Sequence, residues 1–349
     1  MPASNGGLFG ALIASHIAAG CLPTRAECAM TDSTVVLPDF VQALPGGIYA
    51  IDTGFHRPRF DAAYLLVQDG RAAFVDCGTN HAVPRLLATL QALGLPATAV
   101  DYLIPTHVHL DHAGGAGLLM SHLPQATLWV HPRGERHMVD PRALYAGALA
   151  VYGAQEMARS YGELVPVPAH RVRASQDGQA LALGRRRLCF ADTPGHARHH
   201  HCLWDEHTRG WFTGDTFGLS YREFDTAQGA WIVPTTTPVQ FDPPALQASI
   251  QRLLAVQPEC MYLTHFGRVG DVPRLGTLLL NLLQQLADLG RREQHASDRH
   301  QRLKQGQLDL YCASLAAHGV TLSRPQIEAL LAMDLELNAQ GLAIWLDRP

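Results

Sequence analysis

The segment from Thr106 to His112 constrains the fold more than any other part of the chain. The apolar run 101–105 before it predicts a buried strand, and residues 113–120 after it predict a helix. On a continuous strand alternate side chains would point to opposite faces, whereas a tight turn lets them converge. The segment therefore predicts a metal site at a strand end of an α/β sheet, with four candidate ligands: His107, His109, Asp111 and His112.

Further ligand-type residues occupy the same kind of position elsewhere in the chain. Each comes just past an apolar run that predicts a strand: His196 after 187–191, Asp215 after 211–213, and His265 after 260–264. Asp76 likewise ends the run 71–75. Because strand ends gather at the edges of sheets, this repeated placement indicates one shared site.

Without Asp76, the candidate ligands comprise five imidazoles and two carboxylates, which is too many for one tetrahedral ion. It predicts two divalent ions, each with an open coordination position, and a carboxylate is the group that bridges two metals. The ligand types favour zinc, with iron or manganese as alternatives. No cysteine stands at a ligand position. Eight other histidines lack partners and are interpreted as structural or surface residues: His81, His122, His131, His137, His170, His295, His300 and His318.

Composition excludes several classes of function. Hydrophobic residues make up 47% and charged residues 17%, which is typical of a globular protein. The net charge of −4 and the lack of a basic stripe argue against a nucleic-acid partner. Lys304 is the single lysine and lies far along the chain from the histidine cluster, which argues against Schiff-base chemistry. No stretch is long and apolar enough to predict a membrane span.

The seven cysteines are scattered and form no C-x-x-C pair, which favours a reducing, cytoplasmic compartment. The small apolar stretch 7–21, which ends at Cys21, leaves an exported lipoprotein as the alternative. The chain is expected to divide into a leader (1–40), a catalytic domain (41–270) and a helical C-terminal extension (271–349).

Several other segments carry expectations. Residues 64–68 and 71–75 flank Asp69-Gly70 and predict a hairpin. Residues 141–162 predict a helix whose Tyr145, Tyr152, Met157 or Tyr161 could line a substrate pocket, although a packed surface helix fits as well. Residues 217–244, rich in aromatic side chains, are expected to cover the metals. Helices are predicted at 275–289, 299–318 and 325–338, and they could pack on the main domain, form a dimer face or wall the pocket.

The motif His107-Val-His109-Leu-Asp111-His112, followed by His196, Asp215 and His265, resembles the metallo-β-lactamase fold superfamily in its two-metal branch. The likeness is to glyoxalase II-like thioesterases and acyl-homoserine lactonases, and it covers residues 45–270. It implies an α/β fold, the αββα sandwich of two β-sheets with helices outside, with the C-terminal helical extension added.

The resemblance also implies roles for single residues. One metal would be held by His107, His109 and His196, the other by Asp111, His112 and His265, with Asp215 bridging them. Asp76 would fix a ligand by hydrogen bonding. Asp111 is expected to move a proton, and Tyr221 is a candidate donor to the oxyanion. His200 either takes part or is a plain loop residue.

The chemistry implied is hydrolysis of a small ester, lactone or thioester by a hydroxide that bridges the two metals. Two alternatives stay open: an iron-dependent oxidoreductase of the same fold, and a metal-bearing binding or signalling module with little turnover. The expected partner is a small-molecule substrate, and a homodimer is left open. Arg291, Arg292, Arg299 and Lys304 could be interpreted as a glutathione-binding group, although no motif requires it.

Overall fold

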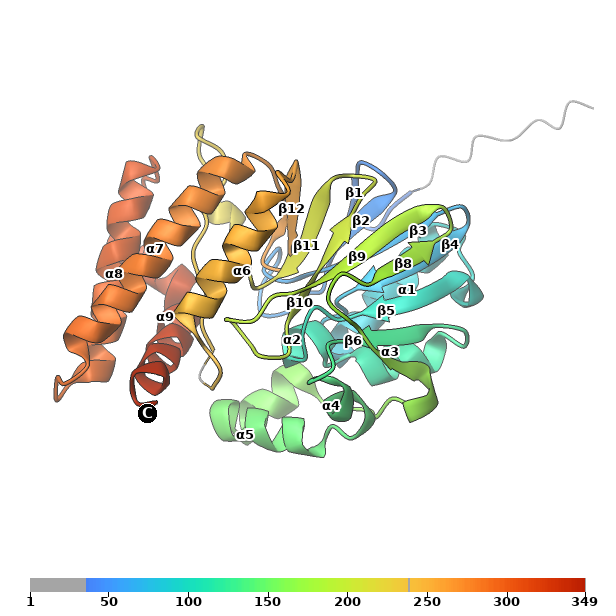
Figure 1. Cartoon of the computed structure of the whole chain (residues 1–349), viewed down its shortest axis with the longest axis horizontal. Coiled ribbons are helices and arrows are strands. Elements are labelled where there is room, and N and C mark those ends of the chain that lie inside the picture. The colour runs from blue at the N-terminus through green and yellow to red at the C-terminus, as the bar shows by residue number, and fades with distance from the viewer. Residues whose placement is uncertain (1–35, 238, 349) are drawn as a thin grey trace, which may run out of the picture. The chain divides into compact units, whose positions relative to one another are not determined.

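The computed structural model describes residues 36–237 and 239–348, which form one compact unit. The alternative of an export signal ending at Cys21 falls outside the described residues, as does most of the expected leader. The described part is a mixed α/β structure with two β-sheets flanked by helices (Figure 1).

The first sheet contains strands β1 to β7 in the order of the sequence. Strands β1 to β4 are antiparallel neighbours, and the pairs β4/β5, β5/β6 and β6/β7 are parallel. The strands are β1 (Val41–Leu44), β2 (Ile48–Asp52), β3 (Ala62–Gln68), β4 (Arg71–Val75), β5 (Val100–Ile104), β6 (Thr127–Val130) and β7 (Val172–Ala174). The expected hairpin is the pair β3 and β4, with Asp69 and Gly70 at its turn.

The second sheet has the order β13-β12-β11-β10-β9-β8. Its pairs are antiparallel except for β11 and β12, which run parallel. The strands are β8 (Ala180–Leu183), β9 (Arg186–Asp192), β10 (His201–Asp205), β11 (Gly210–Gly214), β12 (Cys260–Leu263) and β13 (Gly267–Val269). The short β13 was not predicted.

The helices lie outside the two sheets (Figure 1). They are α1 (Val83–Ala92), α2 (Leu110–Ala113), α3 (Ala116–His122), α4 (Glu135–Val139), α5 (Arg142–Glu156), α6 (Pro243–Ala255), α7 (Val272–Glu293), α8 (Arg299–Ala317) and α9 (Arg324–Leu346). Short 3-10 or π segments are Asn80–Ala82, Ala97–Ala99, Met157–Tyr161, Ala169–Arg171 and Arg222–Phe224. Within the described residues no helix has the length and apolar character to cross a bilayer.

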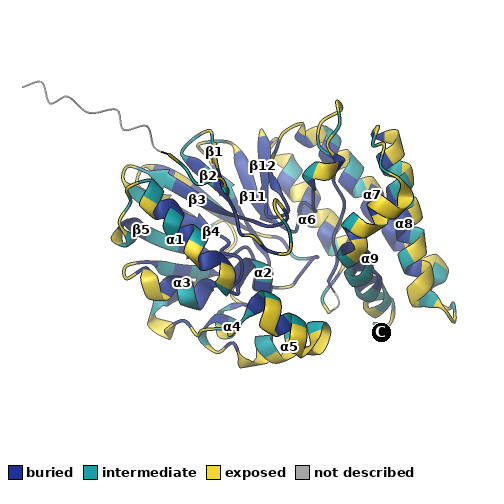
Figure 2. Ribbon diagram, turned by 180° about the vertical axis from the view of Figure 1, so that it is seen from behind, coloured by how far each residue is buried: buried dark blue, intermediate teal, exposed yellow. Residues whose placement is uncertain are grey.

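Three apolar clusters define the layers. Alternate residues of β3 point to opposite faces, because the side-chain period of a strand is two. Tyr64 and Leu66 face the second sheet and pack in a cluster with Phe212 and Tyr262. Leu65 belongs instead to the cluster beneath the outer helices α1 and α3. A third cluster joins the far face of the second sheet to α6 through α9. The order helix, sheet, sheet, helix is the predicted αββα sandwich, and Figure 2 shows its strands as the buried interior.

The segment 217–244 agrees with the expected cover over the metals only in part. Leu219, Tyr221 and residues 235–237 line the pocket that contains candidate ligands, whereas most of its large aromatic side chains lie elsewhere. Its large aromatic side chains Phe224, Trp231 and Phe241 are fully buried and pack in the third cluster with the C-terminal helices. Trp231 donates its indole N–H to Ser314 Oγ on α8 at 2.9 Å. These aromatic residues therefore tie the C-terminal helices to the sandwich, because burying them removes large apolar surfaces from water.

Three helices depart from the sequence-based expectation, and the first of them, the short α4, was not predicted. Helix α6 was not predicted, although Asp242 accepts a hydrogen bond from the Ala245 backbone N–H and two prolines follow it, which is a helix-start signal. Helix α5 is interrupted at Gly153, whose φ of 78° is not helical, and the chain continues as a π turn at Met157–Tyr161. The other predicted helices form within a few residues of their expected limits, except α9, which runs on to Leu346.

Candidate metal centre

The site lies where parallel strands end. Strands β4 and β5 are parallel neighbours in the first sheet, as are β11 and β12 in the second, so their C-terminal ends meet at common edges. His107 and His109 follow β5, and α2 begins at Leu110, which turns Asp111 and His112 back toward them. Asp215 directly follows β11, and His265 comes two residues after β12. The seven predicted ligands gather in overlapping groups of candidate metal-binding side chains: His107, His109, Asp111, His112, His196, Asp215 and His265.

The first group consists of three imidazoles. The Nε2 atom of His107 lies 2.7 Å from Nδ1 of His109, which lies 3.2 Å from Nε2 of His196. Burial lowers the pKa of all three side chains, to about 3 for His109, and the neighbouring imidazoles lower the pKa of His107 further. Neutral imidazoles with their nitrogens turned to one point are metal ligands in their binding form.

The second group combines a carboxylate with two imidazoles. Oδ2 of Asp111 lies 3.4 Å from Nε2 of His265 and 3.7 Å from Nε2 of His112. Burial disfavours the charged imidazoles, but the surrounding carboxylates outweigh it: they raise the pKa of His265 to about 9 and hold that of His112 above its usual range. This half of the site is therefore built around negative charge, which attracts cations.

Asp215 lies between the two groups with one oxygen directed to each. Its Oδ2 is 3.3 Å from Nε2 of His196, and its Oδ1 is 3.3 Å from Nε2 of His112. Oδ1 and the His112 Nε2 are buried and have no hydrogen-bond partner among the described residues. Unsatisfied buried polar atoms are costly, so two facing one another fit atoms that share a bound cation. The donor set thus offers groups of side chains able to hold metal ions, with Asp215 between His196 and His112.

The ligands are held from behind by a hydrogen-bond network. Asp76 Oδ2 accepts from Nδ1 of His112 at 2.9 Å and from the Thr264 hydroxyl at 2.7 Å, while Oδ1 accepts from the Thr106 backbone N–H at 2.7 Å. Nδ1 of His265 donates to the Phe60 carbonyl at 2.9 Å. Partners of this kind fix the tautomer and orientation of ligating imidazoles. Asp76 was expected to fix a ligand by hydrogen bonding, and its contact with His112 agrees with that expectation.

His200 lies behind the ligands and does not line the pocket. Its Nε2 accepts from the Asp215 backbone N–H at 3.3 Å, and Nδ1 lies 2.9 Å from the Thr193 hydroxyl. A Cβ on Gly214 would fall 2.6 Å from His200 Nε2 and 2.5 Å from Thr106 Oγ1, so only glycine fits between β11 and this imidazole. His200 therefore positions the chain that carries Asp215.

Five of the seven candidate ligands line a pocket of about 280 Å³, which we call the metal pocket: His109, Asp111, His196, Asp215 and His265. Helix α5 forms one wall through Leu144, Ala148 and Val151, and α9 contributes Met333 and Leu337. Of the four candidate lining residues on 141–162, the pocket contains Tyr152 and Tyr161, but not Tyr145 or Met157. The C-terminal extension therefore forms part of the pocket wall, one of the three roles that the sequence left open.

Among the residues that the structure describes, no lysine or arginine lines the pocket. The cationic group considered for glutathione lies elsewhere and is paired with acids: Arg291 with Asp288, Arg292 with Glu293, Arg299 with Asp347, and Lys304 with Glu336. The lining is mostly apolar apart from the ligands, the Thr235–Thr237 run and a few polar groups. An uncharged, apolar group fits this pocket better than an anionic one.

Tyr221 lines the pocket, but its hydroxyl is directed to Asp334 on α9. The hydroxyl lies 3.1 Å from both carboxylate oxygens, and the ring stacks on Phe60. Burial raises the pKa of Asp334 to about 6, against the opposing influence of His265. This contact occupies the hydroxyl proton of Tyr221. Its role as oxyanion donor stays a prediction.

Three titratable side chains of the pocket, those of Asp334, His199 and His137, were not predicted from the sequence. Asp334 lies in a helix whose apolar pattern gave no sign that one acid faces inward. His199 and His137 both line the pocket, although His137 had been interpreted as structural or surface. The run of three histidines, His199–His201, was a signal that could have pointed to His199. Only its middle residue, His200, was considered for a functional role.

Comparisons with known proteins agree with this geometry. A family model described as the metallo-beta-lactamase superfamily matches residues 56–265. The chain is 25% identical over 229 residues to the metallo-beta-lactamase fold-containing protein ST1585 of Sulfurisphaera tokodaii, covering 64% of this chain and 79% of that protein. It is 28% identical over 188 residues to the acyl-coenzyme A thioesterase MBLAC2 of Gallus gallus, covering 49% of this chain and 63% of that protein.

Solved structures share the fold. The structure of the archaeal ST1585 superposes on 85% of this chain and 98% of its own at a TM-score of 0.60 and 21% identity. The metallo-beta-lactamase family protein TTHA1429 of Thermus thermophilus covers 87% of this chain and 94% of its own at a TM-score of 0.62 and 20% identity. With the family model spanning more than half of its length, the chain belongs to the metallo-beta-lactamase superfamily, which includes metal-dependent hydrolases.

Proposed function

We propose that the protein is a dinuclear metal-dependent hydrolase that cleaves a thioester with an apolar acyl group. The observation that carries this proposal is the placement of Asp215, with one carboxylate oxygen toward each of two ligand groups, at an apolar pocket without cationic lining. Zinc is the proposed metal, because imidazole-rich sites with a few carboxylates suit it.

Two bound ions supply Lewis-acid polarisation of a carbonyl and lower the pKa of water to about 7. The side chains of the pocket supply the rest. Leu144, Val151, Met333 and Leu337 bind the acyl chain and exclude water from it. The substrate carbonyl is thereby placed at the pocket end that carries Asp111 and His265.

Asp111 is the proposed proton carrier. It is the more exposed of the two ligand carboxylates, at 23% of its side chain against 8% for Asp215, and it lines the pocket. In hydrolysis the oxygen of water bonds to the acyl carbon, the carbon–sulfur bond breaks, and the leaving thiolate needs a proton. A carboxylate at the pocket surface can take the proton from water and return it to sulfur.

A thioester is favoured over a lactone or an aryl ester for one reason from the comparisons. MBLAC2 of Gallus gallus, a relative at 28% identity, is named as an acyl-coenzyme A thioesterase. The apolar wall made by α5 and α9 is consistent with an acyl chain. Glutathione thioesters are less favoured, because no arginine or lysine of the C-terminal helices lines the pocket.

The test is a metal count by mass spectrometry combined with a substrate screen. The metals are counted on the protein as purified, and a zinc-loaded portion of the same preparation is assayed for thiol release from acyl thioesters and for hydrolysis of lactones and aryl esters. We expect two metals per chain and the highest kcat/KM on thioesters. Asp288→Ala, on the outer face of α7, serves as a control that keeps every ligand.

Two results would contradict the proposal. A fully loaded protein that hydrolyses none of the substrates would favour the binding module. A single iron per chain together with oxygen uptake would favour the oxidoreductase. Both measurements use the same preparation, so the two outcomes are told apart directly.

A further inference from the structure

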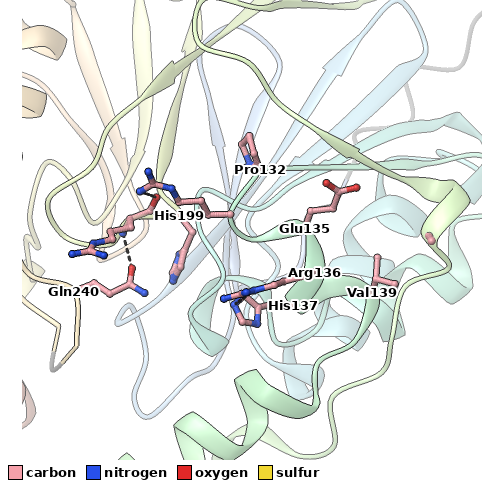
Figure 3. A pocket seen from close by; sticks show the side chains of 10 residues that line it. Pro132, Glu135, Arg136, His137, Val139, His199 and Gln240 are labelled. Atoms are coloured by element: carbon pink, nitrogen blue, oxygen red, sulfur yellow. Dashed lines mark hydrogen bonds between the residues drawn. The ribbon is translucent and has the colours of Figure 1, made fainter.

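A second and wider cleft, of about 900 Å³, adjoins the metal pocket. Three arginines line it: Arg133 after β6, Arg136 on α4, and Arg198 in the turn between β9 and β10. We call it the arginine cleft. Figure 3 shows side chains from α4 on one side and those of His199 and Gln240 on the other. His137, His199 and Gln240 line both cavities, so the cleft is a direct continuation of the metal pocket.

The guanidinium groups of the cleft are free to bind an anion. Among the described residues none of the three makes an ion pair with a carboxylate, whereas the exposed Arg142 and Arg187 do. Glu135 is the one acid in the lining, so positive charge dominates. Arginine presents a planar fork of N–H groups that matches phosphate oxygens and binds them in bidentate fashion.

The backbone around the arginines is held in place. Nη1 of Arg133 donates to the Arg198 carbonyl at 3.4 Å, which connects the two loops. The Arg198 backbone N–H donates to Oε1 of Gln240 at 2.7 Å. These contacts leave most guanidinium N–H groups unused. Arg198 also lies two residues from the candidate ligand His196 along the chain, so the turn that carries the arginine also carries the ligand.

His199 marks the junction of the two cavities. Its side chain is buried, and its Nδ1 has no hydrogen-bond partner among the described residues. Its ring lies 5.4 Å from that of the ligand His109. An unpartnered polar group at this point is available to the part of a substrate that passes from one cavity to the other.

We infer that the arginine cleft binds the phosphate groups of a thiol carrier, so that the substrate is an acyl thioester of a phosphorylated thiol. The inference rests on the proposed function. The acyl chain lies along the apolar wall of the metal pocket, and the carbonyl lies at the candidate ligands. The leaving thiol then extends past His199 and Gln240 into the cleft. Arg133, Arg136 and Arg198 are then the specificity-determining residues for the carrier.

The test compares one acyl group on three thiols: coenzyme A, which carries phosphates, glutathione, which carries carboxylates, and neutral N-acetylcysteamine. The cleft variant is R133Q/R136Q/R198Q, and the control R185Q/R187Q/R302Q removes three exposed positive charges elsewhere. We expect the cleft variant to lower kcat/KM for the coenzyme A thioester about 10- to 100-fold, mainly through KM. The fall for the N-acetylcysteamine thioester should be several times smaller, and the control should behave as the parent protein.

An equal loss on all three thioesters, or no loss on the coenzyme A thioester, would overturn the inference. A loss on the glutathione thioester as large as that on the coenzyme A thioester would overturn the assignment to phosphate.

Binding is measured separately by titrating free coenzyme A into the zinc-loaded protein by calorimetry. The inference expects binding to the parent protein that the cleft variant weakens about 10-fold or more, and unchanged binding in the two proteins would overturn it. If the parent protein hydrolyses no thioester but shows this difference in binding, the proposed function fails while the anion site stands.

Discussion

The metal pocket and the arginine cleft adjoin one another but are built in opposite ways. The candidate ligands His107, His112 and His265 are buried, and of the three only His265 lines the metal pocket. Asp76 accepts a hydrogen bond that orients the His112 ring. In the cleft Arg133 and Arg198 are exposed, and hydrogen bonds hold their loops in place. Among the described residues neither guanidinium pairs with a carboxylate. The proposed catalytic site thus has a fixed geometry, and the proposed anion site keeps its charge accessible.

The difference has an energetic reason. Catalytic groups act through orientation, which requires a rigid and dehydrated setting. An anion site at the surface gains from long-range attraction and does not need each side chain in one place. The four predictions below test this contrast, from the largest expected effect to the smallest.

Asp215→Ala is expected to have the largest effect. It removes the carboxylate directed to both ligand groups, so we expect metal binding to fall below two ions per chain and kcat/KM to fall about 1,000-fold or more. His107→Ala should act similarly. Mass spectrometry of the native protein counts the metals, and thiol release measures activity. Two metals retained in Asp215→Ala would refute the bridging assignment.

Asp334→Asn tests how much the burial of an acid in the metal pocket lowers the free energy of unfolding. Burial raises the pKa of Asp334 to about 6, above its unfolded value, so its contribution to stability is full below about pH 4. That contribution is lost as the pH rises through 6. The variant keeps an oxygen to accept from Tyr221 and carries no charge. We therefore expect it to match the parent protein at pH 4 and to exceed its free energy of unfolding by about 3 kcal/mol at pH 8.

The measurement is chemical denaturation of both proteins at each pH. Both keep every metal ligand, so the difference between them cancels the contribution of metal loss at low pH. A difference that does not change between pH 4 and pH 8 would show that Asp334 has an ordinary pKa.

Leu337→Trp tests whether α9 limits the acyl group. The larger side chain reduces the pocket volume, so we expect kcat/KM for a long acyl thioester to fall about 10-fold relative to the acetyl thioester. Ala332→Trp, exposed on the same helix and outside the pocket, is the matched control. Equal changes for both chain lengths would argue that the acyl group binds elsewhere.

Salt is expected to give the smallest effect, and one confined to the cleft. Raising the ionic strength from about 0.02 M to about 0.5 M screens exposed charges, so kcat/KM for the coenzyme A thioester should fall a few-fold. The N-acetylcysteamine thioester should change little, because the metal pocket carries no exposed cation. A parallel fall for both substrates would mean that salt acts on the metal pocket instead.

Much of the site could be predicted because its signals are local. The ligands His107 to His112 follow one strand within a few residues, and Asp215 and His265 follow others in the same way. Such patterns need no knowledge of distant contacts. The positions of Phe224, Trp231 and Phe241 could not be predicted, for the opposite reason. Composition shows that Trp231 is apolar, but not whether it covers a ligand or is buried beneath a helix whose Ser314 lies 83 residues further along.

The candidate metal ligands could be predicted from the sequence because strand and turn patterns are set by neighbouring residues, and the sandwich fold and family followed from the resemblance that these residues carry. Tertiary structure alone decided that α9 brings Asp334 and Leu337 to the pocket, and that Arg133, Arg136 and Arg198 share a cleft. These residues come from segments far apart along the chain. Only the packing of helices and loops against the two sheets brings them together, and no local pattern records that packing.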